Sequence, residues 1–182
     1  MPRSVSFTLL GILATLSRPT SGEVRWGEYR MPDDRESIRA AVGLVAHDAM
    51  VYPDLTPRES LALMATLHGL DDPRARIAAV LAGAGLTALG DRPARTFSRG
   101  QLQRLAVARA ELHDPTLALF DEPTTGLDAR AVERLEADIA RARSRGRIVV
   151  LVTHDAGFAE RVADVRITLE RGRVAEVRRV AR

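Results

Sequence analysis

Residues 117–128, LALFDEPTTGLD, decide the fold of this chain. Four apolar residues predict a short buried strand, and two adjacent carboxylates, Asp121 and Glu122, stand at its C-terminal end before Pro123 breaks the pattern. Open α/β sheets bind ligands at the carboxyl ends of their strands. Side chains alternate along a strand, so the two carboxylates point in different directions and can take different roles. A strand-to-helix corner with solvated acids is the plainer interpretation, and the pair alone favours it.

Two other segments make a binding site the better interpretation. Residues 98–101, SRGQ, open a predicted helix with Ser98 as its N-cap, and a helix N-terminus offers unpaired backbone N–H groups to an anion. Gly100 permits a phosphate to approach closely. His154 follows the apolar run 148–152 and is therefore expected at the same sheet edge as the two carboxylates. A lone histidine at such a corner is more often structural.

The remaining pattern alternates strands with helices and predicts an α/β fold with a largely parallel sheet. Predicted helices cover about 5–16, 57–67, 72–84, 98–112, 129–145 and 156–163, and predicted strands cover 23–26, 42–46, 117–120, 148–152, 165–169 and 173–178.

The length of 182 residues indicates one domain. Within it we expect a core formed by 1–48 and 108–182, and an inserted helical subdomain over 49–107 that carries the SRGQ segment.

Composition excludes several classes of protein. With 46% hydrophobic and 28% charged residues the chain is typical of a globular domain, and the absence of cysteine excludes disulfides and thiolate metal sites. The sequence contains no lysine, so all 27 basic residues are arginine, and the net charge is only +3. Arginines alternate with acids, as in 137–147, without a basic block or a set of aromatic residues. We therefore expect no nucleic-acid partner.

The apolar opening run, 5–16, raises the question of export or membrane anchoring. It is shorter than the ~20 residues that span a bilayer. The residues that follow, Ser17, Arg18 and Pro19, do not form a small-residue cleavage site of the kind that ends a signal peptide. We expect a short buried helix of the folded domain instead.

Taken in order, these motifs resemble those of the ATP-binding subunit of ABC transporters. SRGQ at 98–101 is similar to the LSGGQ signature, with Arg99 in place of its first glycine, and LALFDEP resembles the Walker B strand. GLDA at 126–129 resembles the D-loop, and His154 matches the switch histidine. The resemblance implies a P-loop NTPase-like core with an inserted helical subdomain, and ATP and Mg²⁺ as cofactors.

The family assigns roles to the matching residues. Asp121 would position Mg²⁺ through water, Glu122 would polarise the hydrolytic water, and His154 would contact the γ-phosphate. Ser98, Arg99, Gly100 and Gln101 (98–101) would face the ATP of a second ATP-binding subunit in a head-to-tail dimer. Asp128 would link the two sites across that dimer.

One motif position departs from the family pattern. The family carries a glutamine that senses Mg²⁺ and water after the strand predicted at 42–46, and Asp48 stands there in this chain. A carboxylate can accept from water or ligate a cation, but it lacks the donor of the amide. Asp48 is thus a second candidate Mg²⁺ ligand.

The phosphate loop, G-x-x-x-x-G-K-[ST], is missing, since the chain has no lysine. Residues 8–24 resemble the helix and strand that follow this loop, and in that register Ser6 replaces the lysine and Phe7 the Mg²⁺-binding hydroxyl. The family's strands before the loop are also absent, which makes the fold N-terminally incomplete. Several charge-assisted bonds of roughly 1.5–3 kcal/mol each would be lost. We expect the isolated chain to bind ATP weakly and to hydrolyse little or none.

Three interpretations remain open. In the first, the chain is an ATPase motor subunit whose start lies upstream of a truncated or frame-shifted sequence. In the second, it is a non-catalytic subunit that offers only its signature face to a partner's ATP. In the third, it is the remnant of a gene. The intact Asp121, Glu122 and His154 favour the first.

The transported substrate is encoded only weakly. The short chain, the SRG form of the signature and residues 52–59, YPDLTPRE, are similar to haem-exporter subunits of cytochrome c maturation. This resemblance implies a peripheral protein at the cytoplasmic face of the inner membrane. Transmembrane permease subunits would dock near residues 48–70.

Overall fold

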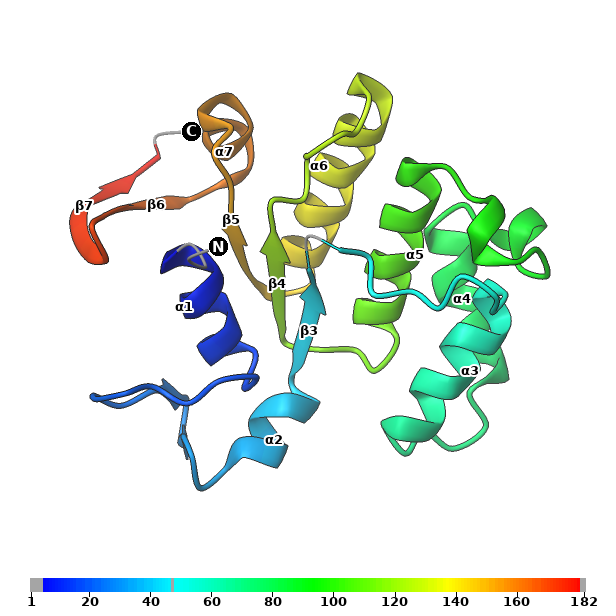
Figure 1. Ribbon diagram of the computed structural model, residues 1–182, viewed down its shortest axis with the longest axis horizontal. Helices are drawn as coiled ribbons and strands as arrows, with labels where there is room; N and C mark the ends of the chain where they lie inside the picture. Colours follow the sequence, from blue (N-terminus) through cyan, green and yellow to red (C-terminus); the bar gives the residue numbers. More distant parts are fainter. Residues whose placement is uncertain (1–4, 47, 181–182) are drawn as a thin grey trace.

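The computed structural model describes residues 5–46 and 48–180. At its centre lies a three-stranded parallel sheet in the order β3-β4-β5, made of β3 (Val42–Val45), β4 (Leu117–Asp121) and β5 (Ile148–Val152) (Figure 1). Because the strands run in the same direction, their carboxyl ends meet at one edge. The α/β class with a parallel sheet is confirmed.

Four shorter or more exposed strands lie outside this sheet. They pair as two antiparallel hairpins, β1 (Arg25–Trp26) with β2 (Tyr29–Arg30) and β6 (Val165–Glu170) with β7 (Arg173–Arg179). The sequence predicted β1, β6 and β7 but not β2, whose two residues are too few to show a period.

The helices follow the predicted ranges closely, with one addition. The structure contains α1 (Val5–Leu13), α2 (Arg35–Ala40), α3 (Pro57–Leu67), α4 (Arg74–Gly83), α5 (Arg99–Glu111), α6 (Ala129–Ser144) and α7 (Ala156–Val162), and the short 3₁₀ turns Thr87–Leu89 and Ala94–Thr96. Only α2, a six-residue helix without a side-chain cap, was not predicted.

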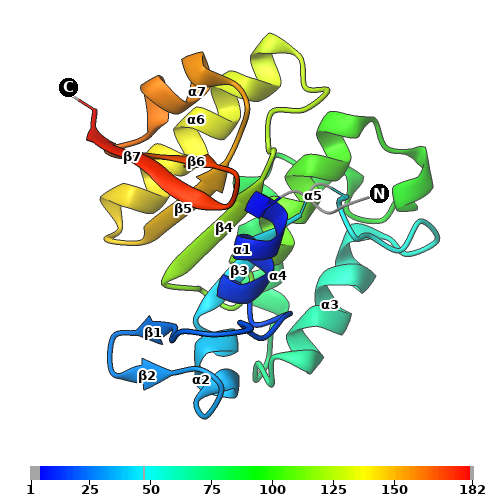
Figure 2. The same ribbon diagram turned by 60° about the vertical axis from the view of Figure 1, so that its left-hand side comes forward.

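Both faces of the sheet are covered by helices (Figure 2). On β4, Leu117 and Leu119 face the cluster that contains Leu10 of α1, whereas Ala118 and Phe120 face the cluster formed with α5, α6 and α7. This alternation is the two-residue period of a strand buried on both sides. It fixes the direction of Asp121, the last residue of β4.

The helices α3, α4 and α5 pack around a cluster of their own, with Leu61, Leu81 and Leu105 fully buried in it. Helix α5 also sends Ala106 and Val107 into the cluster beneath the sheet. It therefore connects the helical part of the molecule to the sheet. The division into a core and a 49–107 subdomain stays a prediction.

The opening run forms α1, which ends at Leu13, earlier than expected. The turn that follows it is held by α2, where the Arg35 guanidinium donates to the carbonyl oxygen of Thr15 at 2.6 and 3.0 Å. Leu10 is buried against the sheet, but Leu16 is 59% exposed, so only one side of the run is buried. Within the described residues, none of the helices has the length and apolar character needed to cross a membrane.

Candidate functional site

Asp121 ends β4 and Glu122 follows it, and the two carboxylates lie in different environments. Asp121 is buried and opposite Val152 of β5. Glu122 leaves the strand with a φ of +48°, and its backbone N–H donates to the Val152 carbonyl at 2.9 Å. A left-handed backbone is uncommon for a residue with a side chain and persists where the surrounding structure fixes it. The bond to β5 is part of that restraint.

Glu122 and His154 lie side by side at this edge. The His154 backbone N–H donates to Oε2 of Glu122 at 3.3 Å, and the His154 Nε2 atom lies 3.5 Å from Oε1. The Glu122 side chain is 20% exposed and the imidazole 90% exposed. Oε1 is buried and has no hydrogen-bond partner among the described residues. A buried acceptor left in this state costs about 1–3 kcal/mol, so the position suits an O–H donor from a water or a ligand.

The SRGQ segment starts α5 through a reciprocal cap. The Ser98 hydroxyl accepts from the backbone N–H of Gln101 at 3.3 Å, and the Gln101 side-chain oxygen accepts from the Ser98 N–H at 2.8 Å. The predicted N-cap is thus confirmed, and Gln101 completes a capping box that its spacing from Ser98 could have revealed. An added Cβ at Gly100 would lie 3.9 Å from Cβ of Ala131, an ordinary contact distance, so the start of α5 packs beside the start of α6.

The loop after Glu122 touches this helix start. Gly126 has a φ of +70°, and an added Cβ there would lie 2.7 Å from Nε and Cζ of Arg99. The sequence motifs at 98–101 and 126–129, far apart in the chain, are therefore neighbours in space. At the end of the loop Asp128 caps α6, with Oδ1 accepting from the Ala131 N–H at 2.8 Å. Its proposed link across a dimer stays a prediction.

Asp48 follows β3 by three residues and is exposed. Because β3 is parallel to β4, Asp48 lies at the same sheet edge as Asp121, as the sequence indicated. The backbone beyond it is held by Arg109 of α5, which donates to the Met50 carbonyl.

The donor set at this edge suits Mg²⁺ only in part. Carboxylates are the protein ligands that Mg²⁺ prefers, and it commonly takes one or two of them together with phosphate oxygens and waters. In the described part of the chain, no group of three or more His, Asp or Glu side chains could hold a metal ion. Asp121 and Asp48 stay candidate ligands for a cation that would take its other ligands from a nucleotide and water.

Helix α1 runs antiparallel to the strands and begins on the side of the carboxyl edge (Figures 1 and 2). Of the segment expected to replace the phosphate loop, residues 1–4 lie outside the described residues, and the replacements at Ser6 and Phe7 stay predictions.

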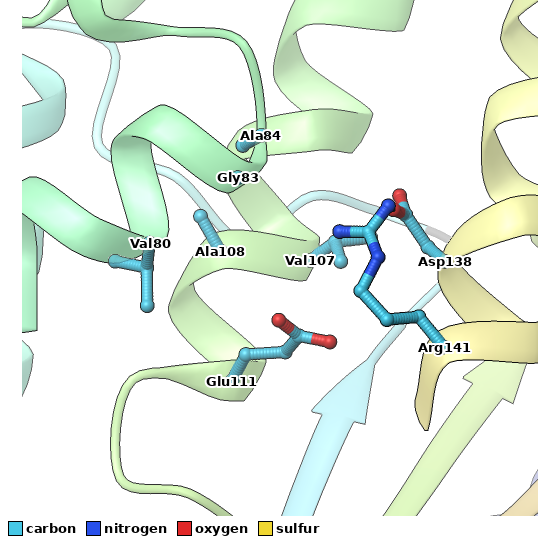
Figure 3. Close-up of a pocket in the computed structure, with 8 residues that line it drawn as sticks. All are labelled: Val80, Gly83, Ala84, Val107, Ala108, Glu111, Asp138 and Arg141. Atoms are coloured by element: carbon cyan, nitrogen blue, oxygen red, sulfur yellow. The ribbon is translucent and has the colours of Figure 1, made fainter. Parts of the chain in front are cut away.

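A separate hollow between α4, α5 and α6 gave no signal in the sequence (Figure 3). It is lined by Glu111, Asp138 and Arg141, and the Arg141 guanidinium lies 3.0 Å from the Asp138 carboxylate. Burial, with a smaller effect of Glu111, raises the pKa of Asp138, against the opposing effect of Arg141. On α5 the hollow is lined by residues of the second half of the helix, from Val107 to Glu111, whereas Ser98 precedes the helix.

Known proteins resemble this chain over most of its length. The sequence model of the ABC transporter family matches residues 7–125. The chain is 38% identical over 149 residues to the cytochrome c biogenesis ATP-binding export protein CcmA of Pseudomonas putida, which covers 81% of this chain and 70% of that protein. It is 36% identical over 173 residues to the maltose/maltodextrin import ATP-binding protein MalK of Escherichia coli K12, across 93% of this chain but only 46% of the relative.

Solved structures agree with the sequence comparison. A dimeric post-hydrolysis state of the ATP-binding cassette MJ0796, bound to ADP and Pi, superposes with a TM-score of 0.86 at 28% identity, over 97% of this chain and 81% of that one. An ATP-binding subunit of an ABC transporter superposes with a TM-score of 0.85 at 28% identity, over 96% and 73% of the two chains. With the motifs gathered at one sheet edge and the family match over more than half of its residues, the chain belongs to the ABC transporter family of ATPases.

Proposed function

We propose that this chain is the ATP-binding and ATP-hydrolysing subunit of an ABC transporter. The observation that carries the proposal is the buried Oε1 of Glu122, which accepts no hydrogen bond among the described residues and lies 3.5 Å from His154 Nε2 at the carboxyl edge of the sheet. A carboxylate held in this way can accept the proton of an attacking water, which is the work of a general base. His154 is exposed next to it and is available to donate to a phosphate oxygen.

The other motif residues receive matching roles. Asp121 and Asp48 would hold Mg²⁺ together with phosphate oxygens and water, and the bound cation would offset charge on the triphosphate. Ser98, Gly100 and Gln101 would present the start of α5 to ATP bound by a second subunit. The dimeric state of the MJ0796 cassette supports a head-to-tail pair, and Asp128 would link its two sites.

For this function the phosphate cradle would come from residues outside this chain, because the chain contains no lysine. We propose that a strand and phosphate loop joined to the start of α1 supply it. Two features of the structure support this. Helix α1 begins at the correct edge (Figure 1), and β5 has no strand of the described chain on the side away from β4.

An ATPase assay tests the proposal with two preparations. The chain alone is expected to bind a fluorescent ATP analogue weakly and to release little phosphate. The chain extended by a strand and the phosphate loop, taken from the reading frame directly upstream, is expected to hydrolyse ATP. In that preparation Glu122→Gln should abolish turnover, whereas Glu133→Gln, an exposed acid on α6, should not change it.

The outcomes separate the alternatives. If the chain alone bound the nucleotide with micromolar affinity, a separate phosphate loop would not be needed for binding, and this part of the proposal would be contradicted. If no upstream frame encodes the loop, and the chain stimulates hydrolysis by a homologous subunit only while its SRGQ segment is intact, the chain is a non-catalytic partner. Failure of both preparations would favour a gene remnant.

For the cargo we propose haem export for cytochrome c maturation. The relative CcmA, an export protein of cytochrome c biogenesis, supports this, although the import protein MalK is nearly as similar. The test uses the extended chain in two strains. It should restore covalent haem in c-type cytochromes of Pseudomonas putida lacking CcmA, and should not restore maltose uptake in Escherichia coli lacking MalK. The reverse result would contradict the assignment.

We also propose that the chain is peripheral at the cytoplasmic membrane face and that permease subunits dock near residues 48–70. Exposed apolar side chains support this surface: Met50 is 59% exposed, Tyr52 63% and Leu67 71%. Because the chain has no cysteine, a single Leu67→Cys variant provides a unique crosslinking site. Crosslinking to permease subunits is expected there, and not from a Glu176→Cys variant on β7.

A further inference from the structure

Arg99 stands where the family signature has a glycine, and its side chain has a defined place. It is the first residue of α5, and the reciprocal cap of Ser98 and Gln101 fixes its backbone. Its guanidinium lies against Gly126, at a point where an added Cβ would be 2.7 Å from Nε and 2.8 Å from Nη1. The contact therefore needs a glycine at 126 for space as well as for its φ of +70°.

The loop that Arg99 touches begins at Glu122. Between Glu122 and the cap of α6 it is closed by two local backbone bonds, from the Thr125 N–H to the Glu122 carbonyl at 3.2 Å and from the Leu127 N–H to the Thr124 carbonyl at 3.1 Å. These two bonds make the loop a continuous turn. A side chain that restrains Gly126 therefore also restrains the backbone of Glu122.

The charge of Arg99 has no partner within the described chain. The side chain is exposed, and none of the ion pairs or hydrogen bonds of the described residues includes it. Other arginines of this region are paired; Arg95, four residues earlier, donates to Asp54 at 2.9 Å. The position of Arg99 is thus set by packing on Gly126 and not by a carboxylate.

We propose that Arg99 is a positioning residue for ATP hydrolysis, which holds the loop of residues 122–128 and through it the left-handed backbone of Glu122. Arg99 thereby connects the start of α5, where a second subunit's nucleotide would bind, to the general base of its own subunit. The kinetic part of this proposal rests on the proposed function, but the structural part does not.

Hydrogen–deuterium exchange of the full chain without nucleotide tests the structural part. In Arg99→Ala the amides of Thr125 and Leu127 are expected to exchange about three- to tenfold faster, because one restraint on two weak bonds is lost. Arg99→Lys should restore little of the protection, since it keeps the charge but lacks the planar guanidinium. Arg95→Ala is the matched control and should leave the loop unchanged. Unchanged exchange in Arg99→Ala would overturn the proposal.

The kinetic part is tested in the extended, hydrolysing preparation. Arg99→Ala is expected to lower kcat about tenfold or more while KM stays within about twofold, as for a residue that orients a catalytic group without touching substrate. A raised KM with unchanged kcat would overturn the proposal and assign Arg99 to nucleotide binding. If the preparation shows no turnover at all, the proposed function fails, and the exchange result still decides whether Arg99 holds the loop.

Discussion

At the scale of a single residue, Gly43 fixes how closely α5 lies on the sheet. A Cβ added to this glycine of β3 would lie 2.4 Å from the carbonyl oxygen of Ala110 and 2.9 Å from Cγ of Pro115. Neither atom can move away without shifting backbone or a ring. We expect Gly43→Ala to lower the free energy of unfolding by about 1–3 kcal/mol, measured by urea denaturation.

A matched substitution at Gly83 separates this contact from the general effect of adding a methyl group. Gly83 is the last residue of α4, and an added Cβ would meet no atom within 4 Å. Gly83→Ala is expected to raise the free energy of unfolding by about 0.5–1 kcal/mol, because alanine loses less backbone entropy in a helix. If both variants were equally stable, the close approach of α5 to β3 would be contradicted.

At the scale of an element, the start of α3 is fixed by a capping box, which the sequence predicts from the spacing of Thr56 and Glu59. The Thr56 hydroxyl accepts from the Glu59 N–H at 3.2 Å, and the Glu59 carboxylate accepts from the Thr56 N–H at 2.8 Å. The Thr56 N–H and, to a smaller extent, the Thr56 hydroxyl, which donates to Oε2 at 2.9 Å, lower the pKa of Glu59. Thr56→Ala should cost about 1 kcal/mol of unfolding free energy.

The control for this cap lies on the same helix. Thr66, which is exposed, donates its hydroxyl to the Ala62 carbonyl at 3.1 Å inside α3. A bond of this kind does not offset the poor helix propensity of threonine, so Thr66→Ala should be neutral or slightly stabilising. Equal losses from the two substitutions, measured by thermal unfolding, would show that the cap contributes nothing specific.

Element boundaries could be predicted where the chain itself carries the signal. Thr56 and Pro57 mark the start of α3, and Ser98 marks that of α5, since caps act over three residues. The hairpin β1–β2 and the helix α2 were harder to predict, because elements of two to six residues are held by their neighbours and show no period of their own.

At the scale of the whole molecule, a histidine pair joins the helical part to the sheet and makes stability depend on pH. His68 ends α3 and stacks on His113 with ring centroids 4.0 Å apart, and Nε2 of His113 bonds the carbonyl of Val42 at 3.0 Å. Burial, then His68, and more weakly Arg76 and Arg147, lower the pKa of His113 from 6.5 to about 4.

The sign of the pH dependence follows from this lowered pKa. As pH falls below 6.5 the unfolded chain takes up a proton at His113, and the folded chain does so only near pH 4. The contribution of His113 to stability is therefore complete above pH 6.5 and is lost as the pH falls towards 4. Urea midpoints should fall less between pH 7 and pH 5 in His113→Gln than in the unchanged chain. An identical fall in both would contradict this.

The sequence by itself determined the elements and the chemical groups. The apolar period of β4, the caps of α3 and α5, and the identities of Asp121 and Glu122 are all set by neighbours within a few residues, so the chain alone reveals them. The complete absence of lysine is also a property of the chain alone.

Only the tertiary structure decided how these groups meet. Three contacts each join residues at least 27 positions apart: Glu122 with His154, Arg99 with Gly126, and His68 with His113. Such contacts depend on sheet register, helix packing and backbone conformation together, and no local pattern in the sequence encodes their combination.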